Sequence, residues 1–128
     1  MTQINNKELI YPELSYRLTG LFFKIHNELG RHCDEKQYAD VLELLFKKEG
    51  ISFCREAKLI GKCFESEISF GLPDFIIEDK IVVDLKAKKF VTKEDYNQML
   101  RYLKGSGYKL GLIVNFRNTY LKAKRIAN

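Results

Sequence analysis

The sequence contains few cysteines and no long apolar run. These two features argue against a cysteine-ligated metal site and against a membrane span. Its three cysteines, Cys33, Cys54 and Cys63, are odd in number and widely spaced, and they form no C-x-x-C pair. This pattern indicates neither a zinc site nor an iron–sulfur cluster, and we expect reduced thiols. No apolar run approaches the roughly 20 residues that span a bilayer. The first residues also lack the basic-then-apolar pattern of a secretory signal. We therefore expect a cytoplasmic protein that makes no membrane contact.

Familiar catalytic motifs are missing as well. The chain has no glycine-rich phosphate loop, no arguable Ser/His/Asp or Cys/His pairing, no repeat and no linker. We interpret the two histidines, His26 and His32, as structural residues. The 128 residues are 45% hydrophobic and 30% charged, which is ordinary globular composition. They are expected to form one domain over residues 1–128, with residues 1–10 loosely ordered.

The net charge of +5 comes partly from two concentrations of basic residues, one in the middle of the chain and one near its end. Their members are Lys86, Lys88 and Lys89, and Arg117, Lys122, Lys124 and Arg125. Such a charge distribution permits a polyanionic partner such as nucleic acid, although many basic domains have none.

Apolar periodicity predicts three helices. The first carries apolar residues at helical spacing up to Leu29, and Gly30 is a natural stop. The second begins at Asp34, with Gln37 as its capping-box partner, and ends at Gly50. Its buried stripe is expected to contain Tyr38, Val41, Leu42 and Leu45.

The third helix is expected over residues 93–104, capped by Thr92 and Asp95 and stopped by Gly105. Its buried face is expected to contain Tyr96, Met99, Leu100 and Leu103. On either side of it, the residue types predict strands. The expected strands are residues 51–61, residues 64–70, a hairpin over residues 75–86, residues 110–116 and a final edge strand near residue 124.

The run at residues 110–116 is nearly all apolar, as in a strand buried on both faces in the centre of a mixed sheet. The third helix links the second hairpin strand to it, and such a crossover is right-handed and joins parallel strands. We therefore predict a mixed α/β (α+β) fold, with a mixed central sheet flanked by helices and the order α-α-β-β-β-α-β.

The hairpin lies within residues 71–89, GLPDFIIEDKIVVDLKAKK, where two apolar runs flank a charged turn. If the turn centres on Asp79, then Phe75 faces Val83 and Ile77 faces Ile81. Side chains alternate between the two faces of a strand. One face is then wholly apolar: Phe75, Ile77, Ile81, Val83 and Leu85. The other carries Asp74, Ile76, Val82, Asp84 and Lys86.

This register makes Asp74 and Asp84 cross-strand neighbours, with Cβ atoms roughly 4.5–5.5 Å apart. Two carboxylates at that distance need a cation between them or a shared proton. Lys86, on the same face, offsets part of the repulsion, and Mg²⁺ would do so better. The alternative is that both aspartates sit at exposed strand ends and point into water, and this stretch alone leaves both interpretations open.

Three further polar residues fall beside the expected apolar stripes. Glu35 opens the second helix, where an acid is also explained by the helix dipole. Gln98 and Tyr102 are i, i+4 partners on the third helix. They are either a surface pair or a polar pair turned toward Lys86 or a substrate phosphate. We expect Lys86 to be an exposed strand-end residue and Lys88 to point to the opposite face or edge.

Pro73-Asp74, followed after nine residues by Asp84-Leu85-Lys86, resembles the signature of the PD-(D/E)XK nuclease superfamily. The chain as a whole, from about Leu9 through Ile126, resembles the GxxExxY proteins, a small family within that superfamily. The stretches that carry the resemblance are ELIYPELSYRLTG, KIHNELG, Glu35-x-x-Tyr38, PDFIIEDKIVVDLKA, Gln98-x-x-x-Tyr102-Leu103, GLIVNF and KRI. One departure matters: His32 stands at the glycine of the motif, while Glu35 and Tyr38 are kept, so the loop must take a conformation that histidine tolerates.

The resemblance implies a restriction-endonuclease-like core and assigns roles by matched position. Asp74 and Asp84 would be metal ligands, Glu35 a further acidic ligand, and Lys86 the residue that positions water or stabilises charge. Gln98 would complete the catalytic set, with Tyr102 as its neighbour.

These roles imply a nuclease that depends on Mg²⁺ or Mn²⁺ and hydrolyses phosphodiester bonds; DNA is the first candidate substrate and RNA the second. The residues expected to contact nucleic acid are Lys86, Lys88, Lys89 and Tyr102. The alternative is a non-catalytic basic module of the same fold that binds nucleic acid or a protein partner. With no separate recognition domain in the 128 residues, sequence-specific cleavage would need a homodimer or a partner.

Overall fold

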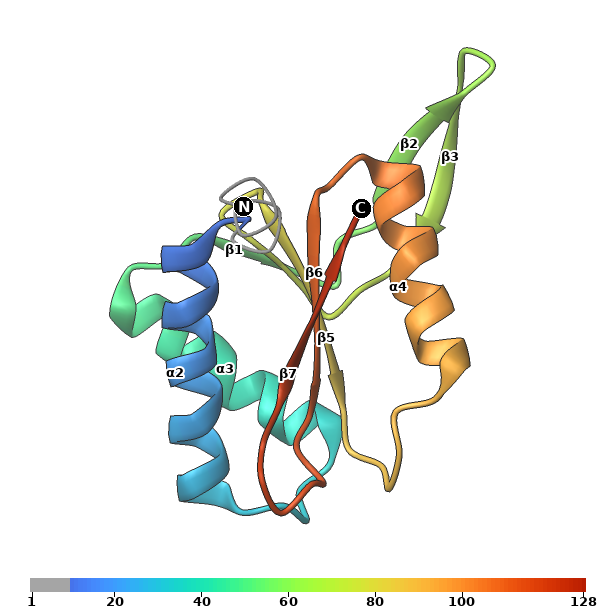
Figure 1. The fold of residues 1–128 in the computed structure, drawn as a ribbon. Coiled ribbons are helices and arrows are strands. Elements are labelled where there is room, and N and C mark those ends of the chain that lie inside the picture. The colour runs from blue at the N-terminus through green and yellow to red at the C-terminus, as the bar shows by residue number, and fades with distance from the viewer. Residues whose placement is uncertain (1–9) are drawn as a thin grey trace, which may run out of the picture.

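The computed structural model describes residues 10–128, so the loose order expected for residues 1–10 falls outside the described residues except at Ile10. Two helices, α2 (Pro12–Leu29) and α3 (Glu35–Glu49), cover one face of a central sheet, and α4 (Lys93–Ser106) covers the other (Figure 1). This arrangement confirms the predicted mixed α/β fold with a mixed sheet flanked by helices. The predicted element order is wrong in detail: among the described residues, five strands, not three, lie between α3 and α4, and two strands follow α4. Within the described residues, no helix is both long and apolar enough to cross a membrane.

The central sheet has five strands in the order β1-β4-β5-β6-β7. Their bounds are β1 Phe53–Arg55, β4 Phe75–Ile77, β5 Ile81–Lys86, β6 Leu110–Asn115 and β7 Ala123–Ala127. Only β5 and β6 are parallel, and α4 connects them as predicted. Every residue of β6 is buried, which confirms a strand covered on both faces, and β7 is the expected edge strand.

The β4–β5 hairpin has the predicted register, with Phe75 opposite Val83 and Ile77 opposite Ile81. Its wholly apolar face packs into the core beneath α2 and α3, together with Phe22, Leu42 and Phe46. Its other face contributes Ile76 and Val82 to a second cluster beneath α4. Because both faces are buried, a slip of one residue would move apolar side chains out of both cores.

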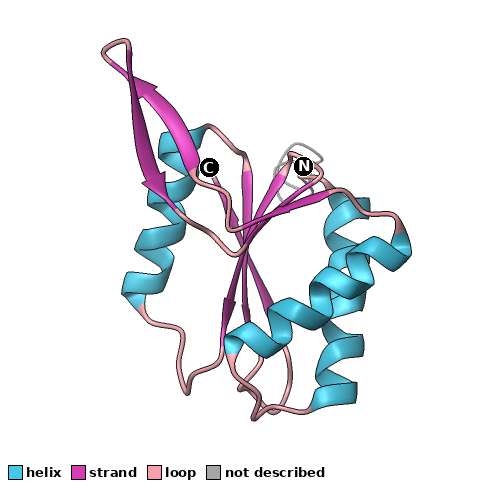
Figure 2. Ribbon diagram, turned by 180° about the vertical axis from the view of Figure 1, so that it is seen from behind, coloured by secondary structure: helices cyan, strands magenta, loops and turns pink. Residues whose placement is uncertain are grey.

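The prediction of one strand over residues 51–61 is wrong, because the extended conformation is interrupted at Glu56, where φ is +53°. Only β1 joins the central sheet. Residues Leu59–Cys63 form β2, which pairs with β3 (Ser66–Gly71) as a separate two-stranded ribbon. Figure 2 shows this ribbon projecting from the body of the molecule. Its turn is Phe64-Glu65, and both residues have positive φ, as tight hairpin turns require. Neither residue is the usual glycine or asparagine, so this turn could not be predicted from the residue types.

The predicted capping boxes, Asp34 with Gln37 and Thr92 with Asp95, are both present. On α3 the buried stripe is Tyr38, Ala39, Leu42 and Phe46, whereas Val41 and Leu45 are only half-buried. On α4 the buried residues include Tyr102, whereas Leu100 is exposed, contrary to the prediction.

The expected stop of α4 at Gly105 is also wrong, because the helix continues to Ser106 and ends at Gly107, which has a φ of +85°. Gly105 serves a different purpose. A Cβ atom there would overlap the ring of Phe70, and a Cβ atom on Gly61 would overlap the Gly105 carbonyl. The two glycines therefore allow the β2–β3 ribbon to pack closely against α4.

Candidate active site

The predicted site residues on the hairpin lie together at one end of β5, and they are not exposed strand ends. Asp84 is buried, and Asp74 and Lys86 are half-buried. The Nζ atom of Lys86 lies 3.0 Å from Oδ2 of Asp84. The interpretation in which both aspartates point into water is therefore wrong.

Asp74 lies just ahead of β4, and its Oδ2 atom accepts a hydrogen bond of 2.7 Å from the backbone N–H of Leu85. Burial raises the pKa of Asp74 to about 7. The Leu85 N–H opposes that rise, while the charges of Asp84 and Glu35 add to it. The two aspartate carboxyls therefore interact, as the cross-strand register predicts, and a cation beside them would relieve the cost of ionising Asp74.

Lys86 is the centre of a polar cluster between β5 and α4. Its Nζ atom lies 3.8 Å from Oδ1 of Asp95 and 3.5 Å from Oε1 of Gln98, in addition to Asp84. Burial lowers the pKa of Lys86, but the negative charges of Asp84 and Asp95 raise it by more, so the net shift is upward. The ammonium group is therefore held in its charged form beside the two aspartates.

Asp95 is a member of this cluster that the sequence reasoning missed. It is buried, closes the capping box of α4 and lies 2.6 Å from Nζ of Lys88 through its Oδ2 atom. Burial raises the pKa of its carboxyl, but bonds from Lys88 and Thr92 outweigh that effect and hold the pKa below its usual range. Lys88 thus shares Asp95 with Lys86, and the expectation that it points away is wrong. The capping box is sufficient to explain an aspartate at this position. The contacts of Asp95 with Lys86 and Lys88 therefore could not be predicted from the sequence.

Gln98 and Tyr102 both lie on the α4 side of the site. Gln98 contacts Lys86, so it is turned toward the hairpin and is not a surface residue. Tyr102 is buried, and the charge of Asp84 adds to burial in raising the pKa of its hydroxyl. A Cβ atom on Gly71 would overlap the Tyr102 ring, so this glycine lets the chain pass close to Tyr102 just before Asp74.

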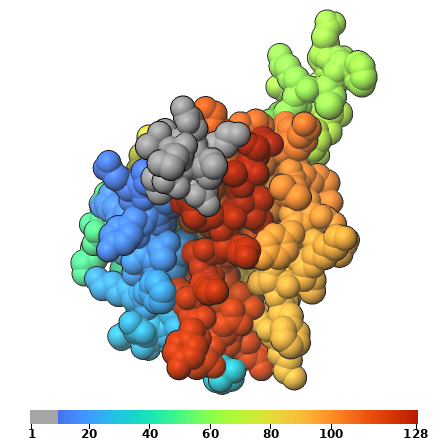
Figure 3. All heavy atoms as spheres, viewed as in Figure 1, coloured from blue at the N-terminus to red at the C-terminus, as the bar shows by residue number. Residues whose placement is uncertain are grey.

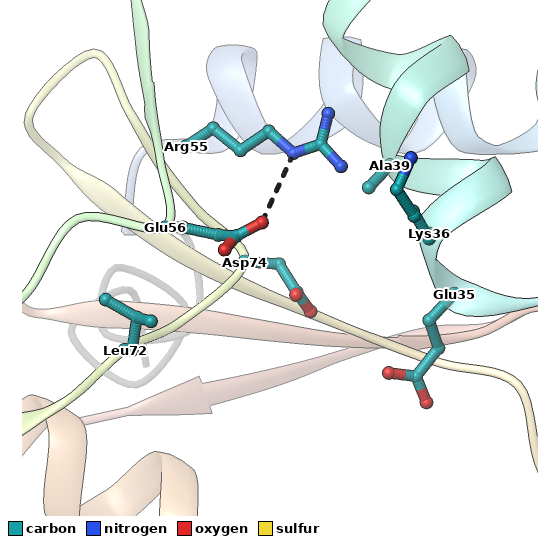
Figure 4. Close-up of a pocket in the computed structure, with 7 residues that line it drawn as sticks. All are labelled: Glu35, Lys36, Ala39, Arg55, Glu56, Leu72 and Asp74. Atoms are coloured by element: carbon teal, nitrogen blue, oxygen red, sulfur yellow. Dashed lines mark ion pairs between the residues drawn. The ribbon is translucent and has the colours of Figure 1, made fainter.

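Glu35, the first residue of α3, faces the same region from the other side. A hollow of about 410 Å³ lies between α3 and the segments leading into β2 and β4. Figure 4 shows Glu35 and Asp74 bordering this hollow from different elements. The residues that line it are Glu35, Lys36, Ala39, Arg55, Glu56, Leu72 and Asp74.

Arg55, the last residue of β1, joins this edge of the sheet to α3. Its Nη1 atom lies 2.8 Å from Asp40 and 3.0 Å from Glu43, and its Nε atom lies 3.8 Å from Glu56. The hydrogen bond to Glu43 is the largest cause of a raised Arg55 pKa. The sequence reasoning missed this residue because residues 51–61 were interpreted as one strand.

Tyr38 fixes the loop that leads into Glu35. Its ring stacks on Phe116, with centroids 4.1 Å apart. Its hydroxyl donates to the carbonyl of Gly30 at 2.6 Å and accepts from the N–H of Cys33 at 3.3 Å. The positive φ of this loop falls on Gly30, and His32 is not among the residues with positive φ. Histidine is therefore tolerated where the motif has glycine.

The family model described as the PD-(D/E)XK nuclease superfamily matches residues 12–126, nearly the whole chain. The chain belongs to this superfamily. Members of the superfamily are nucleases that generally depend on a divalent metal. The match does not distinguish the GxxExxY proteins from other members. No curated protein and no solved structure matches the chain significantly.

The donor set fits a hard divalent cation. Mg²⁺ in proteins is commonly held by one or two carboxylates, with water and phosphate oxygens completing its shell. Asp74 and Asp84 provide two such carboxylates. Burial is the main cause of the raised pKa of Asp74, and the charge of Asp84 adds to it. A cation bound beside both carboxylates would favour the ionised form of Asp74. Among residues 10–128, no group of three or more His, Cys, Asp or Glu residues is close enough to form a metal site, so Glu35 is not gathered with the two aspartates.

Proposed function

We propose that this member of the PD-(D/E)XK superfamily is a GxxExxY protein that hydrolyses phosphodiester bonds in DNA with the help of Mg²⁺ or Mn²⁺. The observation that supports this most strongly is the ion pair between the half-buried Lys86 and the buried Asp84, beside the half-buried Asp74, whose pKa burial raises to about 7. Removing charges from water costs free energy that pairing only partly offsets, and perturbed groups of this kind concentrate at functional sites.

Asp74 and Asp84 would hold the metal, and Glu35 would contribute from across the hollow described above. The metal, when bound, supplies Lewis-acid neutralisation of the phosphate and acidifies water for attack. The two aspartate carboxylates would supply the negative charge and the oxygen ligands for such a cation. Glu35 is exposed and is the first residue of α3, so its side chain can change rotamer without disturbing the core.

Lys86 would stabilise the charge that develops on the phosphate during hydrolysis. A preorganised cation in a water-poor site is worth far more than the same cation in water. Gln98 and Asp95 hold its ammonium from the α4 side, so we assign them positioning roles. Together these residues would keep Lys86 aimed at the phosphate before substrate arrives.

DNA cleavage by the isolated protein tests the proposal. Labelled single-stranded and double-stranded DNA, and RNA of the same sequence, would be incubated with Mg²⁺, with Mn²⁺ or with EDTA. We expect cleavage with either metal, none with EDTA, and none from Asp84→Asn. The matched control is Glu67→Gln, an exposed acid on β3 that should leave the rate unchanged. Absence of metal-dependent cleavage of every substrate would overturn the proposal and favour the non-catalytic binding module.

A further inference from the structure

The excess positive charge of the chain lies in three loops at one end of the sheet. Residues 30–34, 87–92 and 116–122 together contain five lysines and arginines and a single acid, Asp34. The other 17 basic and 16 acidic residues of the chain nearly cancel. The five basic residues are Arg31, Lys88, Lys89, Arg117 and Lys122. We call this set of loops the basic end.

Side-chain hydrogen bonds hold the three loops together. Asn115, which is 2% exposed, accepts from the N–H of Lys88 through Oδ1 and donates to the Lys88 carbonyl at 2.7 Å. The same Oδ1 accepts from the N–H of Arg117. Arg31 donates from Nε to the Arg117 carbonyl at 2.9 Å, which brings in the third loop. The basic end is therefore a built surface whose loops are fixed to one another.

Two aromatic side chains project from the basic end. Phe90 is 75% exposed and Tyr120 is 87% exposed. The Phe90 loop follows directly from Lys86, so it begins at the candidate site. Figure 3 shows all three loops at the same end of the molecule and the β2–β3 ribbon at the opposite end. Exposed aromatics beside cations are the combination with which proteins hold unpaired nucleotides, by stacking on bases while the cations follow the phosphates.

We propose that the basic end binds an unpaired stretch of nucleic acid and leads it to the site. Phe90 and Tyr120 stack on bases. Arg31, Lys89 and Lys122, which are all exposed, contact phosphates. Lys88 contributes less because Asp95 already neutralises it. This inference rests on the proposed nuclease function and adds the substrate class, a single strand.

The aromatic side chains favour a single strand over a duplex for a simple steric reason. The faces of paired bases are covered by their neighbours in the stack, so a ring on a short loop reaches them only at an end or where the strand is unpaired. The cations alone would serve either substrate, because phosphates are common to both. Discrimination should therefore depend on Phe90 and Tyr120, and salt sensitivity on the basic residues.

Fluorescence anisotropy with labelled oligonucleotides in EDTA measures binding without cleavage. The substrates are a single strand of about 15 nucleotides, the matching blunt duplex, and RNA of the same sequence. Loss of one stacked base costs about 1–3 kcal/mol. We therefore expect Phe90→Ala and Tyr120→Ala each to weaken single-strand binding by roughly 5- to 150-fold, with a smaller effect on duplex binding. Tighter binding of either single strand, DNA or RNA, than of the duplex would support the inference.

The matched control is Phe64→Ala, because Phe64 is fully exposed but lies at the tip of the β2–β3 ribbon. All three variants remove exposed side chains, so their melting temperatures should equal that of the wild type. Tighter binding to the duplex, or equal losses in Phe64→Ala and Phe90→Ala, would overturn the inference. A protein that cleaves DNA but prefers the duplex would leave the proposed function standing. One that binds the single strand but never cleaves would overturn the proposed function, and with it the delivery of the strand to a catalytic site, and would leave only single-strand binding by the basic end.

Discussion

The Nζ atom of Lys86 lies 3.0 Å from Oδ2 of Asp84, and the two side chains are only 15% and 10% exposed. An ion pair that has been removed from water is sensitive to the loss of one partner, because the other charge then stays buried without compensation. The sequence predicted an exposed Lys86, and the structure shows that this expectation is wrong, because the residue is half-buried.

We therefore expect Lys86→Ala to lower the free energy of unfolding by about 1–3 kcal/mol at neutral pH in the absence of metal. Urea denaturation followed by circular dichroism measures this change. Lys62→Ala, which removes an exposed lysine from β2, is the control and should change stability by less than about 0.5 kcal/mol. Equal stability of the two variants would mean that the Lys86–Asp84 pair is not held as the structure describes.

Metal binding should stabilise the fold through Asp84. A ligand that binds only the native state at 100 times its dissociation constant adds about 2.7 kcal/mol. We expect saturating Mg²⁺ or Mn²⁺ to raise the melting temperature of the wild type by several degrees and to leave Asp84→Asn almost unchanged. Glu67→Gln should keep the full gain. A similar gain in wild type and Asp84→Asn would place the metal elsewhere.

The hydroxyl of Tyr38 should contribute to the stability of the fold. Tyr38→Phe leaves the carbonyl of Gly30 and the N–H of Cys33 without their partner, and unmade bonds of this kind cost about 1–3 kcal/mol. Chemical denaturation should show a loss in this range. Tyr16→Phe removes the hydroxyl of an exposed tyrosine and should have almost no effect. Equal effects of the two substitutions would show that the loop before Glu35 does not depend on Tyr38.

The contacts of Arg55 predict a pH-dependent contribution to stability. Hydrogen bonds from Lys36 and Arg55 lower the pKa of Asp40, and those from Arg55 and Lys47 lower the pKa of Glu43. A carboxyl whose folded pKa lies below its unfolded value stabilises the protein above the unfolded pKa and loses that effect as the pH falls.

Arg55→Met should therefore lower the melting temperature at pH 7 and lower it much less near pH 3, where both carboxyls take up protons. Thermal unfolding at the two pH values measures the difference. A deficit that stays the same at both values would mean that Arg55 acts through its packing on Phe75 and not through its charge.

The hairpin and the capping boxes could be predicted from the sequence because local chemistry determines them. Alternation of apolar residues around Asp79 is compatible with one register that buries both faces, and that register makes Asp74 and Asp84 neighbours. Asp34 and Thr92 are cap residues with a partner three positions later, which marks a helix start without tertiary information.

The remainder of the site depends on contacts between distant segments. Arg55 meets Asp40 and Glu43 only because β1 lies beside α3, and periodicity says nothing about that approach. Asp95 closes the capping box of α4 and also contacts the lysines that follow β5 or end it. Because the capping box alone accounts for an aspartate there, the sequence does not indicate the contact with the lysines. Gly105 looks like a helix stop, whereas the close packing of Phe70 is what requires it.

Single-turnover cleavage of labelled DNA in Mg²⁺, comparing Lys86→Ala with Lys62→Ala, tests the proposed role of Lys86 most directly. Both variants would be measured at a temperature at which circular dichroism shows them folded. We expect Lys86→Ala to lose cleavage by a factor of ~10² or more, because a preorganised charge stabiliser is gone, with only a modest drop in DNA affinity. Lys62→Ala should cleave at the wild-type rate. Equal rates in the two variants, or no cleavage by the wild type, would contradict a catalytic role for Lys86.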